Sequence, residues 1–188
     1  MQTKKVKLFI GEKVYLKPFE KEDIEVVYDG ICNEKIRKLT GLQRVYTKNF
    51  MDEYSEKISN DASRVFLLIV TSDNDTIIGD VEINSIDTFN RNANIRIEIH
   101  NEDYLGNGYG TEAMQLMLKH GFGTLNLHRI ELEVFSYNAR AIKAYEKLGF
   151  KKEGVKRQSL YYDFAYHDAI TMSMLKEEFI NLYVNIKG

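Results

Sequence analysis

The stretch IRIEIHNEDYLGNGYGTEAMQLMLKHGF, residues 95–122, joins a strand pattern to a helix pattern through a loop rich in glycine. Isoleucine alternates with polar residues over 93–100, which predicts a strand with one buried face. From Thr111 to Phe122 the apolar residues recur at the spacing of one helical face. N–H groups at a helix start are unpaired, and glycine lets a ligand approach the backbone closely, so the loop indicates a phosphate-binding cradle. The three glycines of the loop are Gly106, Gly108 and Gly110.

Two familiar phosphate-binding loops do not fit this glycine pattern. A Walker A loop needs a lysine after its second glycine, and no lysine lies between 103 and 113. A dinucleotide-binding loop needs its third glycine three residues after the second, whereas these glycines are spaced by two. The repeated strand–helix units of the dinucleotide fold are also missing. A glycine-rich turn that binds no ligand, and a module for another nucleotide, stay open on this pattern alone.

The remaining periodicities place the loop inside a mixed sheet. We predict an α/β (α+β) fold with a mainly antiparallel sheet and one strand–helix–strand crossover at the glycine loop. No composition shift marks a boundary, so we expect a single domain over 1–188 with its core at about 12–176. Predicted strands lie at 13–19, 64–70, 77–86, 93–100, 129–136, 150–157 and 167–175, with the aromatic segment 160–167 as the last turn, and predicted helices lie at 20–31, within 33–62, at 111–122 and at 138–148.

Composition restricts the function classes. Of the 188 residues 44% are hydrophobic and 29% are charged, as in soluble globular proteins, and the net charge of -2 argues against broad nucleic-acid binding. The apolar run 8–10 is too short for a signal peptide and no run approaches a membrane span, so we expect a cytoplasmic protein without membrane contact. Cys32 is the single cysteine, which excludes an intrachain disulfide. No His-Glu-x-x-His pattern occurs, and we expect no metal.

A second motif, YNARAIKAYEKLGF at 137–150, decides between these readings of the glycine loop. Asn138 is a favoured first residue for a helix and Gly149 a favoured stop, while Ala141 and Tyr145 share one helical face. Together with the loop, this segment resembles the GNAT superfamily of acetyl-CoA-dependent N-acetyltransferases. The family's phosphate loop, Gln/Arg-x-x-Gly-x-Gly/Ala, corresponds to 105–110, and its Asn-x-x-Ala-x-x-x-Tyr-x-x-x-Gly-Phe hallmark is matched at every named position.

Three further segments narrow the resemblance to one branch of the superfamily. VYLKPFEKED at 14–23, HGFGTLNLHRIELEV at 120–134 and GVKRQSLYYDFAYHDAITMSM at 154–174 look most like ribosomal-protein N-terminal acetyltransferases and spermidine N-acetyltransferase. One position departs from the family, because Leu105 stands where Gln or Arg is usual. Backbone N–H groups do most of the phosphate work, so we expect binding to survive without a side chain there.

The resemblance implies how the co-substrate acetyl-CoA lies. Backbone N–H groups of 105–111 cradle the pyrophosphate, and the central sheet splays between the fourth and fifth strands, so that the pantetheine arm pairs with the fourth strand. Asn138 is implied in binding that arm. Lys143 is implied in reaching the 3′-phosphate, with a solvated helix charge as the equal alternative. The residues implied in CoA binding are Ile97, Glu98, Ile99, Leu105, Gly106, Asn107, Gly108, Tyr109, Gly110, Thr111, Asn138 and Lys143.

Catalysis of acetyl transfer to an amine needs an acid and a base. By resemblance Tyr145 is the general acid that protonates the thiolate, with a core aromatic as the alternative. A free alkylamine has a pKa of about 10 and is charged at neutral pH, so a base must remove its proton. Glu98 and Glu82 are the candidates, on strands expected to line the site. For both, a cross-strand ion pair on an exposed face is the alternative.

The acceptor amine stays open in the sequence. A protein N-terminus and a small amine are both compatible, and a polyamine is the alternative, as is a CoA-binding regulator without catalysis. A homodimer also stays open, with the aromatic closing hairpin as its interface or as lining of the acceptor site. Acidic residues that suit a polyamine, or form a solvated helix surface, are Glu34, Asp52, Glu53, Glu56 and Asp61.

Overall fold

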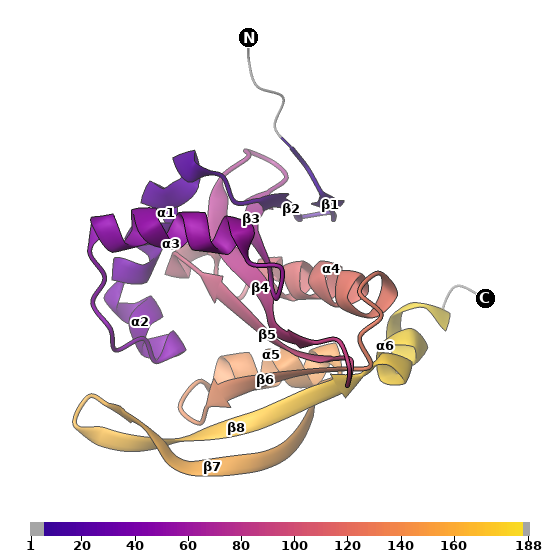
Figure 1. The fold of residues 1–188 in the computed structure, drawn as a ribbon. Helices are drawn as coiled ribbons and strands as arrows, with labels where there is room; N and C mark the ends of the chain where they lie inside the picture. Colours follow the sequence, from indigo (N-terminus) through magenta and orange to yellow (C-terminus); the bar gives the residue numbers. More distant parts are fainter. Residues whose placement is uncertain (1–5, 186–188) are drawn as a thin grey trace.

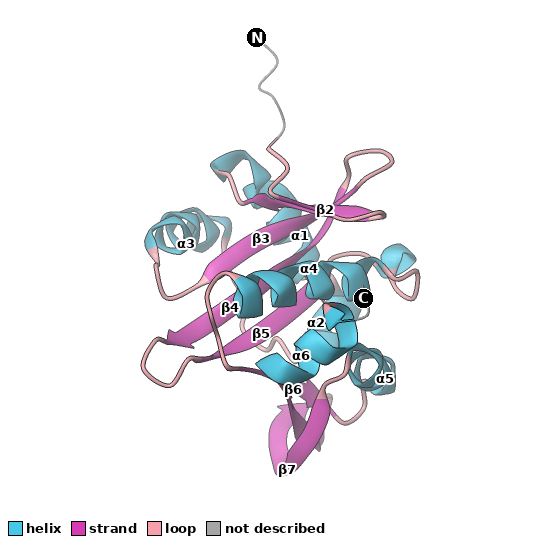
Figure 2. Cartoon of the chain, turned by 90° about the vertical axis from the view of Figure 1, so that its right-hand side faces the viewer, coloured by secondary structure: helices cyan, strands magenta, loops and turns pink. Residues whose placement is uncertain are grey.

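The computed structural model describes residues 6–185, which form one mixed sheet with helices on both faces (Figures 1 and 2). The strands follow the order β1-β2-β3-β4-β5-β6-β8-β7. The strands are β1 (Phe9–Ile10), β2 (Val14–Pro18), β3 (Val65–Thr71), β4 (Ile77–Asp87), β5 (Asn92–Ile99), β6 (Arg129–Phe135), β7 (Lys151–Tyr162) and β8 (Ala165–Leu175). The helices are α1 (Ile24–Cys32), α2 (Glu34–Thr40), α3 (Lys48–Asn60), α4 (Tyr109–Gly123), α5 (Ala139–Leu148) and α6 (Lys176–Tyr183).

Strand β3 shows how the alternation of side chains builds two cores. Phe66 and Leu68 are buried on one face with residues of α1 and α3, whereas Leu67 and Ile69 are buried on the other with residues of α4. The two faces follow from the period-two geometry of a strand. Figure 2 shows α4 and α6 together in front of the sheet, with α1 and α3 behind it. The four central apolar side chains of this strand, at 66–69, are therefore covered by helices on both faces.

The crossover at the glycine loop is confirmed, and so is the splay of the sheet. Strands β5 and β6 pair in parallel from Asn92–Asn94 to 129–131, and all other neighbours in the described sheet pair antiparallel. Past Asn94 the ladder between these two strands ends. The remaining part of β5, residues 95–99, therefore has a free edge toward β6. These are the fourth and fifth strands of the sequence prediction, because β1 is a short strand that the sequence did not predict.

The closing hairpin differs from the prediction of an aromatic turn over 160–167. Strand β7 continues to Tyr162 and β8 begins at Ala165, which leaves a turn of Asp163 and Phe164, both with positive φ (53° and 61°). Aromatic residues favour strands and pair well across them. Tyr161 lies opposite Tyr166 with ring centroids 5.0 Å apart. The aromatic residues therefore extend the strands, and Figure 1 shows the hairpin along the lower edge of the molecule.

Helix α6 was not predicted, because its eight residues carry a weak apolar pattern. Glu178 in its first turn accepts a hydrogen bond from the Leu175 N–H at 2.9 Å, which caps the helix start. Phe179 is buried against Phe122 of α4, with ring centroids 5.3 Å apart. The buried ring of Phe179 and the cap at Glu178 thus help to fix this helix to the core.

Gly30 fixes the distance between α1 and the end of β5. A Cβ atom added at Gly30 would lie 2.4 Å from Cγ of His100, which is buried. We expect Gly30→Ala to lower the free energy of unfolding by about 1–3 kcal/mol, the usual range for overpacking. Urea denaturation measures this change. The matched control is Gly123→Ala, where an added Cβ meets no atom within 4 Å; equal stability of the two variants would contradict the packing argument.

Candidate active site

A cavity of about 650 Å³ opens where the β5–β6 ladder ends. Its walls come from α2, β5, the glycine loop, α4, β6 and α5. Two of the residues implied in CoA binding, Asn107 and Tyr109, lie outside its lining, and so does Glu82. The residues implied by sequence that do line it are Ile97, Glu98, Ile99, Leu105, Gly106, Gly108, Gly110, Thr111, Asn138, Lys143 and Tyr145.

The glycine loop forms the start of α4 and takes a conformation that requires glycine. Gly106 and Gly108 have φ of 83° and 87°, and Gly108 is the residue that precedes the first turn of α4. A residue with a side chain rarely adopts this left-handed backbone conformation, because it is strained there. The first N–H groups of a helix have no partner inside it and carry positive partial charge. The cavity wall formed by the loop is therefore suited to an anion.

Helix α5 carries Tyr145 into the cavity and is fixed at both ends. The Asn138 side chain accepts a hydrogen bond from the Ala141 N–H at 3.2 Å and donates one to the Leu39 carbonyl of α2 at 3.4 Å. Gly149, with φ of 101°, ends the helix. Asn138 thus caps α5 and ties it to α2, and its implied contact with pantetheine stays a prediction.

Tyr145 is held as a protonated phenol. Its ring packs edge-on against Phe150, with centroids 6.1 Å apart. Burial raises the pKa of Tyr145 to about 12. At neutral pH the hydroxyl therefore keeps its proton and is available as a donor inside the cavity.

The sheet register brings the charged residues of β4 and β5 to one face. Asp80 pairs with Glu98, and Glu82 pairs with Arg96. Because Phe66 and Leu68 of β3 pair with Glu82 and Asp80 in turn, these charges lie on the face covered by α1 and α3. The alternation over 93–100 had placed Arg96, Glu98 and His100 on one face, and the structure confirms it.

Glu98 is a buried carboxyl group at the cavity wall. Its side chain is 8% exposed, and its Oε1 has no hydrogen-bond partner among residues 6–185. Burial, and secondly the charge of Asp80, raise the pKa of Glu98 to about 7, against the opposing charges of His100, Arg96 and Arg37. A carboxyl group with this pKa exchanges a proton readily at neutral pH, as a general base must.

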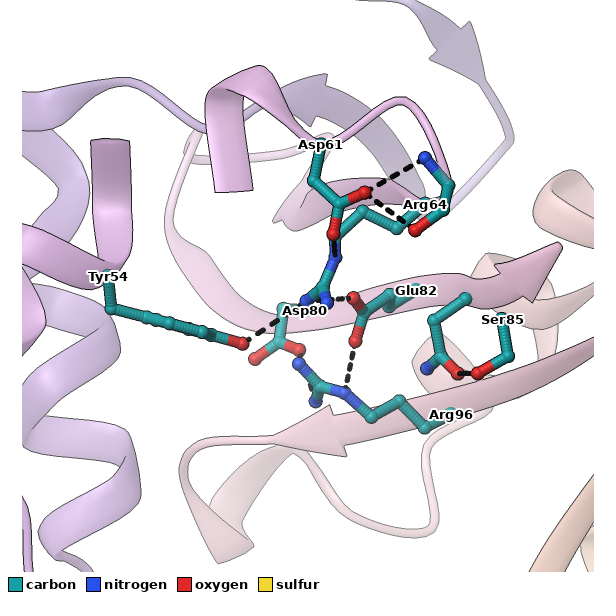
Figure 3. Close-up of polar contacts among 9 residues, drawn as sticks. Tyr54, Asp61, Arg64, Asp80, Glu82, Ser85 and Arg96 are labelled. Atoms are coloured by element: carbon teal, nitrogen blue, oxygen red, sulfur yellow. Dashed lines mark hydrogen bonds and ion pairs between the residues drawn. The ribbon is translucent and has the colours of Figure 1, made fainter. Parts of the chain in front are cut away.

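Glu82 lies in a different environment, although the sequence offered it as an equal candidate. Its Oε1 accepts a hydrogen bond from Arg64 at 3.0 Å and its Oε2 one from Arg96 at 2.5 Å (Figure 3). Arg64 comes from the turn before β3 and also binds Asp61 at 2.7 Å. Both oxygens of Glu82 are thus engaged by arginines, which favours a structural ion-pair role over proton transfer.

Asp80 joins this network to a buried histidine. Its Oδ1 accepts one hydrogen bond from Arg96 at 2.9 Å, and its Oδ2 lies 2.8 Å from Nε2 of His100. The charge of Arg96 holds the pKa of Asp80 low against the effect of burial. The contact between Asp80 and His100 could not be predicted from the sequence, because it depends on how β4 pairs with β5.

Several cavity residues were not predicted, and the acidic residues of the helical region do not line it. Helix α2 contributes Ile36, Leu39 and Thr40, whose helical spacing was the available signal. Basic side chains at the walls are Arg96, Arg140, Lys143 and Lys147. The acidic residues that the sequence analysis named as suited to a polyamine all lie outside the lining: Glu34, Asp52, Glu53, Glu56 and Asp61.

Residues 6–185 contain neither a metal-binding cluster nor a helix that could span a membrane. Their His, Cys, Asp and Glu side chains form no group of three or more that could hold a metal ion. No described helix combines the length and the apolar character that crossing a membrane requires.

Comparison with known proteins assigns the family. The family described as acetyltransferase (GNAT) domain matches residues 13–151. The SPbeta prophage-derived uncharacterized N-acetyltransferase YokL of Bacillus subtilis is 32% identical over 175 residues, covering 93% of this chain and 96% of that protein. Spermidine N(1)-acetyltransferase of Escherichia coli K12 is 30% identical over 172 residues, covering 90% of each.

The fold comparison agrees with the sequence comparison. The crystal structure of spermidine N-acetyltransferase from Vibrio cholerae in complex with CoA and spermine superposes with a TM-score of 0.84 at 24% identity, covering 90% of this chain and 99% of that one. The chain belongs to the GNAT acetyltransferase family. It is an acetyl-CoA-dependent N-acetyltransferase that transfers an acetyl group to an amine, as the resemblance implied.

Proposed function

We propose that the protein acetylates a primary amine of a polyamine such as spermidine or spermine, inside the cavity between β5 and β6. One observation carries the proposal. Glu98 is a buried carboxyl group with an oxygen without a described partner and a pKa of about 7, and it shares the cavity with Tyr145 and the glycine loop. A base, an acid and an anion cradle at one cavity are what acetyl transfer from CoA requires.

The charge beside the cavity favours a cationic acceptor. Four carboxylates lie close together on β4, β5 and the turn before β3. Within residues 6–185 their ion pairs contain two arginines, Arg64 and Arg96, and one histidine, His100. Such an excess of negative charge attracts ammonium groups and raises their local concentration. The relative from E. coli acts on spermidine by its name. The four carboxylates are Asp61, Asp80, Glu82 and Glu98.

The proposed reaction is direct transfer without a covalent enzyme intermediate. Glu98 takes a proton from the ammonium group, directly or through water. The free amine nitrogen attacks the thioester carbonyl carbon, forming the C–N bond as the C–S bond breaks. Tyr145 gives its proton to the departing sulfur, and the second proton that the acetylated nitrogen loses passes through solvent to the Tyr145 oxygen. Glu98 returns its proton to solvent, so one proton is released per turnover. The products are the N-acetylated polyamine and CoA.

Acetyl-CoA is proposed to lie along the cavity from α4 to the free edge of β5. The N–H groups of 105–111 receive the pyrophosphate, and the pantetheine arm pairs with residues 97–99. Exposed Lys143 lines the cavity from α5, in reach of the 3′-phosphate.

We also propose that the chain is one domain over 1–188 and works in the cytoplasm.

Release of the CoA thiol across a panel of amines tests the proposal. We expect turnover with spermidine and spermine, and little with an aminoglycoside or with peptides that begin with Ala or Ser. Turnover with the peptides alone would overturn the polyamine proposal in favour of protein N-termini. Binding of acetyl-CoA without turnover of any amine would favour a CoA-binding regulator.

A further inference from the structure

The turn between β1 and β2 lies against the glycine loop, although 94 residues separate the two contacting positions. Nζ of Lys13 donates a hydrogen bond to the Asn107 carbonyl oxygen at 2.9 Å. A Cβ atom added at Gly108 would lie 3.3 Å from the same Nζ. An ammonium group therefore contacts the middle of the proposed pyrophosphate cradle, from a part of the chain that the sequence motifs do not include.

Glu112 in the first turn of α4 holds this β1–β2 turn in place. Its carboxylate accepts hydrogen bonds from the backbone N–H groups of Glu12, Lys13 and Val14, at 2.7, 2.8 and 2.8 Å. A Cβ atom added at Gly11 would lie 2.6 Å from Cδ of Glu112, so the turn and the carboxylate are in close contact. Three charge-assisted hydrogen bonds fix the backbone from which the Lys13 side chain extends.

The negative charge of Glu112 at the start of α4 opposes anion binding there, and the positive charge of Lys13 compensates for it. A carboxylate in the first turn stabilises a helix, but it also lowers the attraction of that helix end for an anion. The usual Gln or Arg at the head of the loop is absent, since Leu105 stands there. The ammonium group of Lys13 places a positive charge at the loop, which offsets the charge of Glu112.

We propose that Lys13 is a positioning residue for the pyrophosphate of acetyl-CoA: it fixes the Asn107 carbonyl, and thereby the loop, and supplies the positive charge that Leu105 does not. This inference rests on the proposed function of the glycine loop. Because Asn107 lies outside the cavity lining, Lys13 acts from behind the loop and not through direct contact with the reacting atoms. Its effect falls on binding of the phosphates and not on the chemical step.

Lys13→Met is the direct test. We expect the Kd for acetyl-CoA and the KM for acetyl-CoA to rise about five- to tenfold, with kcat at saturation and the KM for spermidine unchanged, because only donor binding is weakened. Lys13→Arg should restore most of the affinity, since it keeps the charge and a donor. The matched control is Lys119→Met, which removes an exposed charge from the later turns of α4, away from the glycine loop, and should leave the Kd for acetyl-CoA unchanged.

Truncated donors identify the group that Lys13 serves. With 3′-dephospho-CoA the defect of Lys13→Met should persist, and with acetyl-pantetheine, which lacks the phosphates, the variant and the wild type should behave alike. Loss of the defect with 3′-dephospho-CoA, or equal acetyl-CoA affinity of variant and wild type, would overturn the proposal. Failure of the wild type itself to bind acetyl-CoA would instead reject the proposed function of the loop.

Discussion

Tyr145→Phe is expected to lower kcat about 10²- to 10⁴-fold, which is the range for loss of a general acid. The pKa of Tyr145, raised to about 12 by burial, keeps the hydroxyl protonated until sulfur leaves. The phenylalanine ring preserves the packing against Phe150. Because the lost interaction is made in the transition state, the Kd for acetyl-CoA should change little. Thiol release at saturating substrates measures kcat, and titration calorimetry measures the Kd.

The control for this variant removes the same atom elsewhere. Tyr183 on α6 lies outside the cavity lining, and its hydroxyl donates a hydrogen bond to the carbonyl of Leu148, the last residue of α5, at 2.9 Å. Tyr183→Phe should leave kcat unchanged. If Tyr145→Phe kept the kcat of the wild type, Tyr145 would not be the general acid. It would then be a core aromatic residue, which is the alternative that the sequence left open.

Glu98→Gln is expected to lower kcat/KM about 10²-fold at pH 8 and to change its pH dependence. The base must be ionised to accept a proton, and the pKa of Glu98 is about 7 in the folded protein. Wild-type kcat/KM with spermidine should therefore rise with pH between about 6 and 8, with an apparent pKa of about 7. Glutamine cannot titrate, so the kcat/KM of the variant should not show this rise with pH. An identical pH profile in the two proteins would exclude Glu98 as the base.

The same variant should be more stable than the wild type at high pH. The pKa of Glu98 is raised on folding from its ordinary value of 4.5 to about 7, so the folded state binds the proton more tightly than the unfolded state. Wild-type stability therefore falls as the pH rises from about 4.5 to about 7. We expect Glu98→Gln to gain up to about 3 kcal/mol in free energy of unfolding at pH 8, and nearly nothing at pH 4.

Urea denaturation at the two pH values measures this difference, with Glu82→Gln as the matched control. Glu82 accepts hydrogen bonds from Arg64 and Arg96, so its replacement removes one carboxylate partner from each arginine and leaves only Asp61 and Asp80, which should destabilise the fold. Destabilisation of Glu98→Gln at pH 8 would mean that Glu98 is also a structural ion-pair partner, contrary to its role as a strained base.

Those features of the site that depend on residues close together in the chain could be predicted from the sequence. The alternation over 93–100 separates Ile97 from Glu98, and the spacing of Ala141 and Tyr145 puts both on the cavity side of α5. The glycine loop and the following helix are also one continuous segment. Short-range periodicity decides all of these features.

The sequence could not decide whether Glu82 or Glu98 is the general base, because their environments depend on partners from distant segments. Arg64 reaches Glu82 from the turn before β3, and Asp80 meets Glu98 through the register of β4 and β5. No periodicity encodes such pairings. The contact of Lys13 with the glycine loop is hidden for the same reason, since the sheet order brings the β1–β2 turn to the start of α4.

A crystal structure of the protein with CoA and spermidine tests the central claim most directly, namely that acetyl transfer takes place in the cavity between β5 and β6. The account predicts the CoA sulfur within hydrogen-bond distance of the Tyr145 hydroxyl, the pyrophosphate on the N–H groups of 105–111, and an amine nitrogen beside the Glu98 carboxylate. CoA bound elsewhere on the chain, or spermidine held away from Glu98 while CoA fills the cavity, would contradict it.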